Sequence, residues 1–149
     1  MNEFLDNAKN ELKRVDHLIY VSLKYTRTVD VIKSTIERMM SAFEQGFLGL
    51  LEKVKKRRKS FEIPPQPRAR CDLLKEVFPK DKKLNDFVEF YLLLRDLSQA
   101  KYDKREEYRR HVTMTAYLGK NEPFEVNIDI LYEYYDKCKK FIEYLEEAL

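Results

Sequence analysis

Glycine, proline, cysteine and tryptophan are scarce in this sequence of 149 residues, which has three glycines, five prolines, two cysteines and no tryptophan. Because glycine and proline interrupt helices and strands, their scarcity favours long unbroken elements. Two cysteines, Cys71 and Cys138, cannot build a disulfide framework, so we expect a reducing compartment, the cytoplasm. No apolar run approaches the ~18 residues of a membrane span, and the start Met1-Asn2-Glu3 lacks the pattern of a signal peptide. We therefore expect no membrane association.

Charge and size narrow the class of protein further. Charged residues make up 37% and apolar residues 44% of the chain, a balance typical of a folded globular protein. The length is that of one domain, so we expect residues 1–149 to form a single domain. Between Lys53 and Arg70 eight basic residues accompany one acidic residue, Glu62, so this window carries +7. Because the whole chain carries +3, the remainder carries −4, and the positive charge is a local feature.

Apolar residues recur at steps of three and four over most of the sequence, which is the spacing of helices with one buried face. The pattern predicts five helices: from Leu5 to residues 24–27, from Val29 through the Lys/Arg run after Val54, from about Ala69 to Phe78, from about Asp81 past Leu97, and from about Asn127 to Leu149. Residues 98–119 keep a looser helical rhythm, and no segment shows sustained strand alternation. The sequence predicts an all-α fold, an antiparallel bundle of five to six helices.

Two of the three glycines, Gly46 and Gly49, lie inside the second predicted helix on the same side as Ala42. A glycine within a helix costs about 1 kcal/mol relative to alanine. We expect another backbone to come unusually close at this point. The alternative is that the glycines are simply tolerated at a surface.

Several kinds of enzyme site have no counterpart in the sequence. There is no glycine-rich phosphate loop, no cysteine pair with zinc spacing, no Glu-x-x-His for a carboxylate-bridged metal site, and no Gly-x-Ser-x-Gly elbow. We therefore expect neither a metal nor a cofactor. Histidine chemistry is restricted to His17 and His111, and His17, beside the apolar stripe of the first helix, is interpreted as structural.

His111 stands out because it ends a segment rich in arginine, with Arg105, Arg109 and Arg110 before it. Arginine carries a fixed positive charge suited to phosphate, and histidine titrates near neutral pH, so the pair predicts phosphate binding or phosphodiester cleavage. The alternative is a solvated, charged helix face. On a regular helix residues six apart point about 120° from each other, so one chain would align Arg105 and His111 poorly. Two chains about a two-fold axis could bring four such side chains into one cleft, which predicts a homodimer.

These features resemble the HEPN superfamily of helical-bundle proteins. The similarity covers two long antiparallel helices, a buried central helix, the charged stretch from Ala100 to His111, and a closing helix over residues 131–145. Active members carry an arginine, four to six intervening residues and a histidine, and Arg105 and His111 have five between them. Where the family commonly has a polar residue after the arginine, this chain has Glu106 and Glu107, whose carboxylates we expect to pair with it.

The resemblance implies a metal-independent endoribonuclease with a composite site across a homodimer, often in toxin–antitoxin systems beside a nucleotidyltransferase partner. It implies that Arg105 stabilises the phosphate charge and that His111 acts as general acid or base, while Arg109 and Arg110 hold the RNA backbone. Many family members have lost the motif and serve as binding modules. The alternative function is therefore a non-catalytic interaction or assembly module, such as an antitoxin-like partner or a structural subunit.

Two further sets of residues each allow a functional and a structural interpretation. The first comprises candidate nucleic-acid contacts: Lys55, Lys56, Arg57, Arg58 and Lys59. These residues could bind phosphates non-specifically, or could simply complement the dipole at a helix end. The second comprises tyrosines of the last helix: Tyr132, Tyr134, Tyr135 and Tyr144. We interpret these rings as structural, with a base-stacking platform as the alternative. The sequence thus predicts a protein that interacts with RNA or nucleotides.

Overall fold

The computed structural model describes residues 2–119 and 122–149, which form mostly helix with one small sheet. The elements are α1 (Glu3–His17), the π-helical turn η1 (Leu18–Ser22), α2 (Leu23–Tyr25), α3 (Val29–Arg57), α4 (Pro67–Val77), α5 (Lys82–Gln99), β1 (Lys101–Arg105), β2 (Thr113–Tyr117), β3 (Phe124–Asn127) and α6 (Ile128–Ala148). The predicted predominance of helix is confirmed. No helix within the described residues is long and apolar enough to span a membrane.

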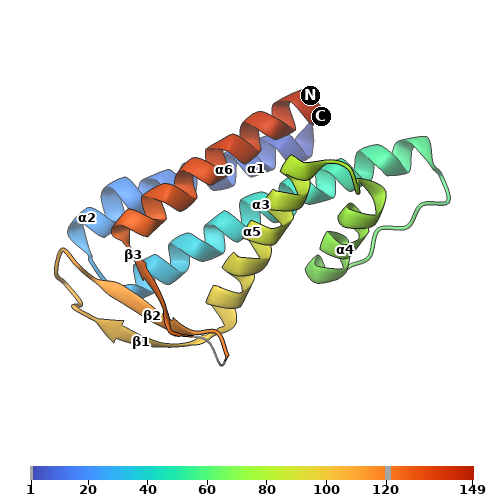
Figure 1. The fold of residues 1–149 in the computed structure, drawn as a ribbon. Coiled ribbons are helices and arrows are strands. Elements are labelled where there is room, and N and C mark those ends of the chain that lie inside the picture. The colour runs from blue at the N-terminus through green and yellow to red at the C-terminus, as the bar shows by residue number, and fades with distance from the viewer. Residues whose placement is uncertain (1, 120–121) are drawn as a thin grey trace.

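The helices are arranged around α3, the longest of them (Figure 1). Helices α1 and α3 run antiparallel, α6 lies against both, and α5 and α4 cover another side of α3. The side chains of Asn2, Thr28 and Asn127 cap α1, α3 and α6 by accepting hydrogen bonds from backbone N–H groups of the first turn. The start of α1 and the end of α6 lie side by side, away from the sheet, and α3 extends beyond them.

An aromatic cluster fills the middle of the bundle. The rings of Phe43 on α3 and Phe141 on α6 stack with their centroids 4.4 Å apart, and Phe90 on α5 meets Phe43 edge-on at 5.5 Å. A Cβ atom on Gly46 would lie 2.5 Å from the Phe141 ring, and one on Gly49 would lie 2.7 Å from the Cβ of Phe4. The expected close approach at the glycines is therefore present, but side chains rather than another backbone occupy the space.

The expectation of a purely helical fold is wrong, because three segments between α5 and α6 form strands. Strands β1, β2 and β3 form an antiparallel sheet in that order, with Arg105 opposite Thr113 and Met114 opposite Val126. The β-branched residues before and within β2 favour extended backbone. Met114 and Val126 are buried in the helical core, whereas β1 is a charged outer strand, which discourages pairing with another chain. Periodicity missed these strands because they are short and β1 buries almost nothing.

Candidate nucleic-acid interface

The loop between β1 and β2 is tied to the start of α3. The backbone N–H of Tyr108 donates to the carbonyl of Arg27 at 2.6 Å, and the Glu107 carboxylate accepts from the backbone N–H of Val29 at 2.9 Å. Glu107 thereby caps the N-terminus of α3, where a negative charge is favourable. Two residues of the loop, Glu106 and Tyr108, have positive φ angles of 51° and 66°. Such backbone costs non-glycine residues about 1 kcal/mol or more each, so its anchors hold the loop in a strained shape.

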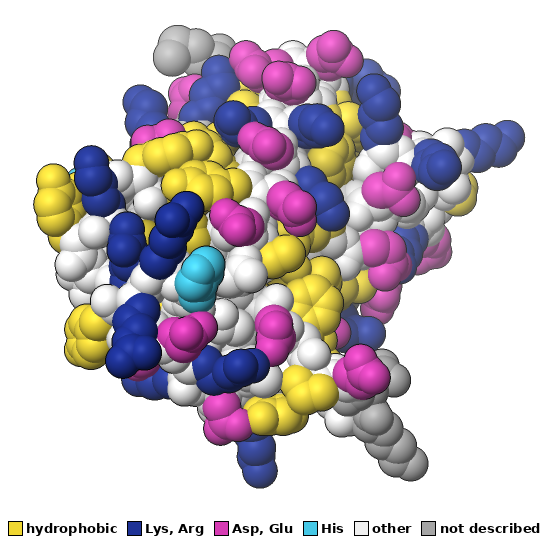
Figure 2. Space-filling view, turned by 60° about the vertical axis from the view of Figure 1, so that its left-hand side comes forward, with side chains coloured by type: hydrophobic (Ala, Val, Ile, Leu, Met, Phe, Trp, Pro, Cys, Tyr) yellow, Lys and Arg dark blue, Asp and Glu magenta, His cyan; other side chains and the backbone are white. Residues whose placement is uncertain are grey.

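A cleft of about 620 Å³ opens where this loop meets α2, β3 and the start of α6; we call it the hairpin cleft. Its charged and aromatic lining consists of Lys24, Arg27, Arg105, Arg110, His111, Glu106, Glu125, Asp129, Tyr20 and Tyr132. Figure 2 looks toward this end of the molecule and shows Lys and Arg side chains near a histidine, with Asp and Glu side chains among them. The cleft thus offers four fixed positive charges to an anionic ligand, partly balanced by three carboxylates.

Arg105 and His111 line this same cleft within one chain. The expectation that one chain would align them poorly assumed a helix, but Arg105 lies on strand β1. Arg105 ends β1 and its cross-strand neighbour Thr113 begins β2, so the chain reverses between them and returns His111 to the vicinity of Arg105. The Thr113 hydroxyl donates to the carbonyl of His111 at 2.9 Å, which holds the end of the turn. A second copy of the chain is therefore not needed to bring Arg105 and His111 to one cleft.

The ion pair of Arg105 also differs from the expected one. Its guanidinium Nη1 lies 2.8 Å from an Oε1 atom of Glu125 on β3, while Glu107 faces Lys104 at 3.7 Å and the start of α3. The expected pairing of Arg105 with Glu106 or Glu107 is wrong, because Glu125 pairs with Arg105 and Glu107 turns to the start of α3. Both partners of the observed pair are more than half exposed, so it contributes at most about 1 kcal/mol and a phosphate could displace Glu125.

Arg27 supplies the most unusual polar group of the cleft. Its Nε atom is buried, and among the residues that the structure describes it has no hydrogen-bond partner. A buried donor without a partner costs about 1–3 kcal/mol. Since the Arg27 side chain also lines the hairpin cleft, an anionic ligand there could satisfy the guanidinium.

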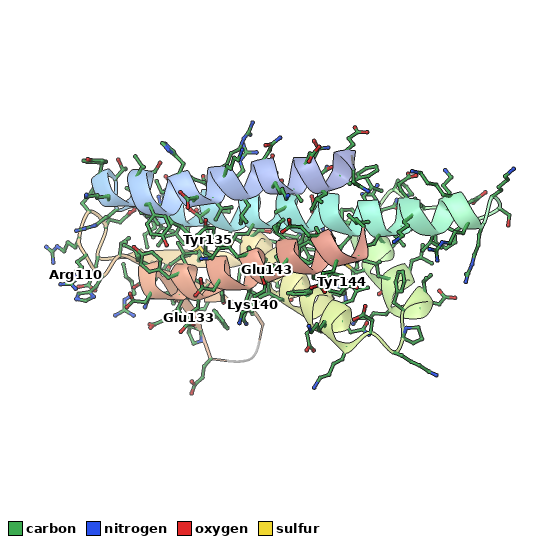
Figure 3. All side chains as sticks on the ribbon, turned by 90° about the horizontal axis from the view of Figure 1, so that it is seen from above. Arg110, Glu133, Tyr135, Lys140, Glu143 and Tyr144 are labelled. Atoms are coloured by element: carbon green, nitrogen blue, oxygen red, sulfur yellow. The ribbon has the colours of Figure 1, made fainter. Side chains whose placement is uncertain are left out.

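The predicted nucleic-acid contacts fall into two separate places. Arg110 lines the hairpin cleft and reaches outward from this end in Figure 3, and Arg109 is exposed in the same loop. The exposed residues 55–59, the basic segment, lie at and beyond the opposite end of α3. A helix of 29 residues is about 43 Å long, so the structure does not bring the two groups together.

Other residues of the cleft were missed by sequence reasoning. Tyr20, Lys24 and Arg27 line it from η1, α2 and the following connection, and Glu125 comes from β3. Tyr20, Lys24 and Arg27 are spaced by four and three residues, which indicates one face of a helix. This spacing could have predicted that they lie together. Glu125 carried no such signal, since its position depends on a strand that periodicity did not predict.

Other candidate chemistry is weak in the described part of the chain. It contains no group of three His, Cys, Asp or Glu side chains placed to hold a metal ion. Both cysteines are free and buried, and burial raises the pKa of Cys71 to about 11, which makes it a poor nucleophile near neutral pH. His17 is exposed at the end of α1 and does not line the hairpin cleft. The cleft is therefore the strongest candidate site.

Comparisons with family models, with curated proteins and with solved structures give no match for this chain. The functional argument accordingly depends on the residues and geometry of the hairpin cleft.

Proposed function

We propose that this chain is a HEPN-like RNA-interacting protein that binds the RNA backbone in the hairpin cleft and cleaves it without a metal ion. The observation that carries the proposal is that Arg105 and His111 line one cleft in a single chain. The unpartnered Nε of Arg27, whose side chain lines the same cleft, supports an anionic ligand.

The proposed reaction is the attack of a ribose 2′-hydroxyl on the adjacent phosphorus, with loss of the 5′-oxygen of the next nucleotide. His111 accepts the proton of the 2′-hydroxyl or donates one to the leaving oxygen, and Arg105 stabilises the charge that develops on the phosphate. Arg27 and Arg110 bind the flanking phosphates. The products are a 2′,3′-cyclic phosphate and a free 5′-hydroxyl, and no redox step is involved.

A homodimer remains part of this proposal, because a second copy could supply the second histidine that acid–base catalysis uses. The exposed rings of Tyr25 and Tyr108, at 80% and 77% exposure, lie near the cleft and suit a contact with another protein. That partner is a second copy of the chain or, in a toxin–antitoxin pair, a nucleotidyltransferase. A cytoplasmic location belongs to the same proposal.

The test is RNA cleavage by the purified protein in the presence of a chelator, with product ends identified by mass. Replacement of His111 by alanine should lower the cleavage rate by about 10²–10⁴-fold, which is the contribution of a general acid or base. His17→Ala is the matched control, since His17 is exposed and outside the cleft, and it should leave the rate unchanged.

Three results would separate the candidate functions. Cleavage that depends on His111 and survives the chelator supports the ribonuclease. RNA binding without such cleavage overturns the catalytic part and leaves a protein that only binds RNA. Absence of any RNA binding overturns the proposal as a whole and favours the non-catalytic interaction or assembly module, to which the exposed tyrosines also point.

A further inference from the structure

Two exposed tyrosine rings line the hairpin cleft beside its arginines. Tyr20 and Tyr132 are 47% and 38% exposed, and their ring centroids lie 5.6 Å apart with the planes tilted by 43°. They come from η1 and α6, which are far apart in the sequence, so the fold brings them together. An exposed pair of amphipathic rings next to phosphate-binding groups is the arrangement that single-stranded nucleic acid recognition uses.

The Tyr20 ring is supported from behind by a buried tyrosine. Tyr135 meets Tyr20 edge-on at a centroid distance of 6.0 Å, and its hydroxyl donates to the Asp16 carboxylate at 2.7 Å. Figure 3 shows Tyr135 on the α6 helix, whose other side carries Glu133 and Lys140 into solvent. Because Tyr135 is 8% exposed and hydrogen-bonded, the platform is held in position before any ligand arrives.

The backbone beneath Tyr20 is also unusual. Residues Leu18–Ser22 form a π-helical turn, in which the N–H of Leu23 donates to the carbonyl of Leu18, five residues earlier. Such turns are rare and occur frequently at functional sites. Here the wide turn sits between α1 and α2 and carries Tyr20 at its centre, so the irregular backbone and the exposed ring coincide.

We infer that Tyr20 and Tyr132 form a base-stacking subsite, so the RNA that enters the hairpin cleft is single-stranded with an unpaired base on this platform. Stacking uses the flat face of a base, which neighbouring pairs cover in a duplex. The subsite is tolerant of base identity, because every base offers such a face. This inference rests on the proposed function, since Arg27 and Arg105 bind the phosphates of the same strand.

The experiment compares binding of four probes to the full chain: a single-stranded pentauridylate, its abasic counterpart with the same phosphates, a short RNA duplex and inorganic phosphate. The base-stacking subsite predicts that the pentauridylate binds about tenfold or more tightly than the abasic strand and the duplex. Tyr20→Ala and Tyr132→Ala should each remove most of that difference, whereas Tyr20→Phe should retain it. Tyr117→Ala, which removes another exposed tyrosine outside the cleft, is the matched control.

The outcomes distinguish the subsite from the proposed function. Equal binding of the pentauridylate and the abasic strand overturns the stacking subsite but leaves phosphate binding in the cleft intact. Equal loss of affinity in Tyr20→Phe and Tyr20→Ala also overturns it, because the hydroxyl rather than the ring would then act. Failure of all RNA probes to bind overturns the proposed function and the subsite together.

Discussion

The two ends of α3 are both rich in positive charge, but they hold it in different ways. At the hairpin cleft, Arg105 is paired with Glu125 at 2.8 Å and Arg27 is partly enclosed, with its backbone carbonyl bound to the loop. At the other end, the side chains of the basic segment are exposed and make no hydrogen bond or ion pair within the described residues. The cleft has four cations where the basic segment has five, but Arg105 and Arg27 are held in place before a ligand binds.

The difference shows that charge density along the sequence and an organised anion site are separate properties. The basic segment carries the strongest charge signal in the chain, but its exposed lysines and arginines must lose conformational freedom on binding. The cleft combines an anchored loop, an arginine whose Nε atom is buried, and a tilted pair of tyrosine rings. We therefore propose that RNA binds in the cleft and that the basic segment adds, at most, a salt-sensitive attraction.

The largest effect is expected from Gly46→Leu in the middle of α3, which connects the two ends. Even a Cβ atom there would lie 2.5 Å from the Phe141 ring and 2.7 Å from Leu145, so the larger side chain should destabilise the fold by about 3 kcal/mol. Urea unfolding followed by circular dichroism measures this loss. Gly119→Leu is the control: a Cβ atom there would have no neighbour within 4 Å among the described residues, and the positive φ of 98° makes about 1 kcal/mol the expected cost. Equal stability of both variants would contradict the close contact.

The next prediction tests which end of α3 binds a short RNA. A pentauridylate bound in the cleft is too short to span the ~43 Å length of α3 to the basic segment, so its affinity should depend on the cleft alone. Arg27→Ala should weaken binding about tenfold, as expected for loss of a charge-assisted contact. Replacement of all five cations of residues 55–59 by glutamine should change it less than about twofold.

Fluorescence anisotropy at two salt concentrations provides the measurement. Arg27→Lys serves as the matched variant, because it keeps the charge but removes the planar guanidinium, and circular dichroism checks that each variant is folded. If the glutamine variant loses the pentauridylate while Arg27→Ala retains it, the assignment of the two ends is reversed.

The fold was predictable wherever helical periodicity extended over several turns. Helices α3, α5 and α6 follow the expected apolar spacing, and the glycine pair on α3 correctly indicated a close neighbour. Strand β1 could not be found in this way, because its side chains are almost all exposed and no alternation results. Strand β2 is buried at three successive residues, so it also lacks alternation, and only its β-branched residues hinted at extended backbone.

The candidate site was predictable in its residue types but not in its geometry. The sequence singled out Arg105, His111 and Arg110, which all line the cleft. Arg27 and Tyr20 depend on a contact between segments some 80 residues apart, formed when the N–H of Tyr108 bonds to the carbonyl of Arg27. Such long-range placement comes from tertiary structure, which spacing along one segment does not encode.

The third prediction compares two tyrosines of α6, one in each half of the helix, whose hydroxyls bond to aspartates of other segments and so anchor α6. Tyr135 donates to Asp16 at 2.7 Å in the half with the cleft, and Tyr144 donates to Asp81 at 2.5 Å in the other half. Burial, followed by the bond to the aspartate, raises the pKa of both hydroxyls. The unfolded chain therefore releases these protons near pH ~10, while the folded chain retains them. The stability that these two hydroxyls contribute is fully present below that pH and falls as the pH rises above it.

Urea unfolding at pH ~8 and pH ~10.5 measures the loss. Tyr135→Phe and Tyr144→Phe should each lower stability at pH ~8 by about 1 kcal/mol and reduce the further loss at high pH. Tyr25→Phe is the control, since its side chain is 80% exposed. We expect the larger effect at Tyr135, which is more buried than Tyr144. A pH dependence unchanged in both variants would contradict the role of these anchors.

The smallest effect tests whether Glu125 competes with RNA for Arg105. Its ion pair with Arg105 is exposed, so removing the charge in Glu125→Gln should raise the affinity for pentauridylate only about two- to fivefold. Glu122→Gln is the control, because Glu122 is exposed and does not line the hairpin cleft. In an Arg105→Ala background the gain from Glu125→Gln should disappear if Glu125 acts through that arginine. A gain that persists would instead reflect a general reduction of negative charge near the cleft, and Glu122→Gln should then produce it as well.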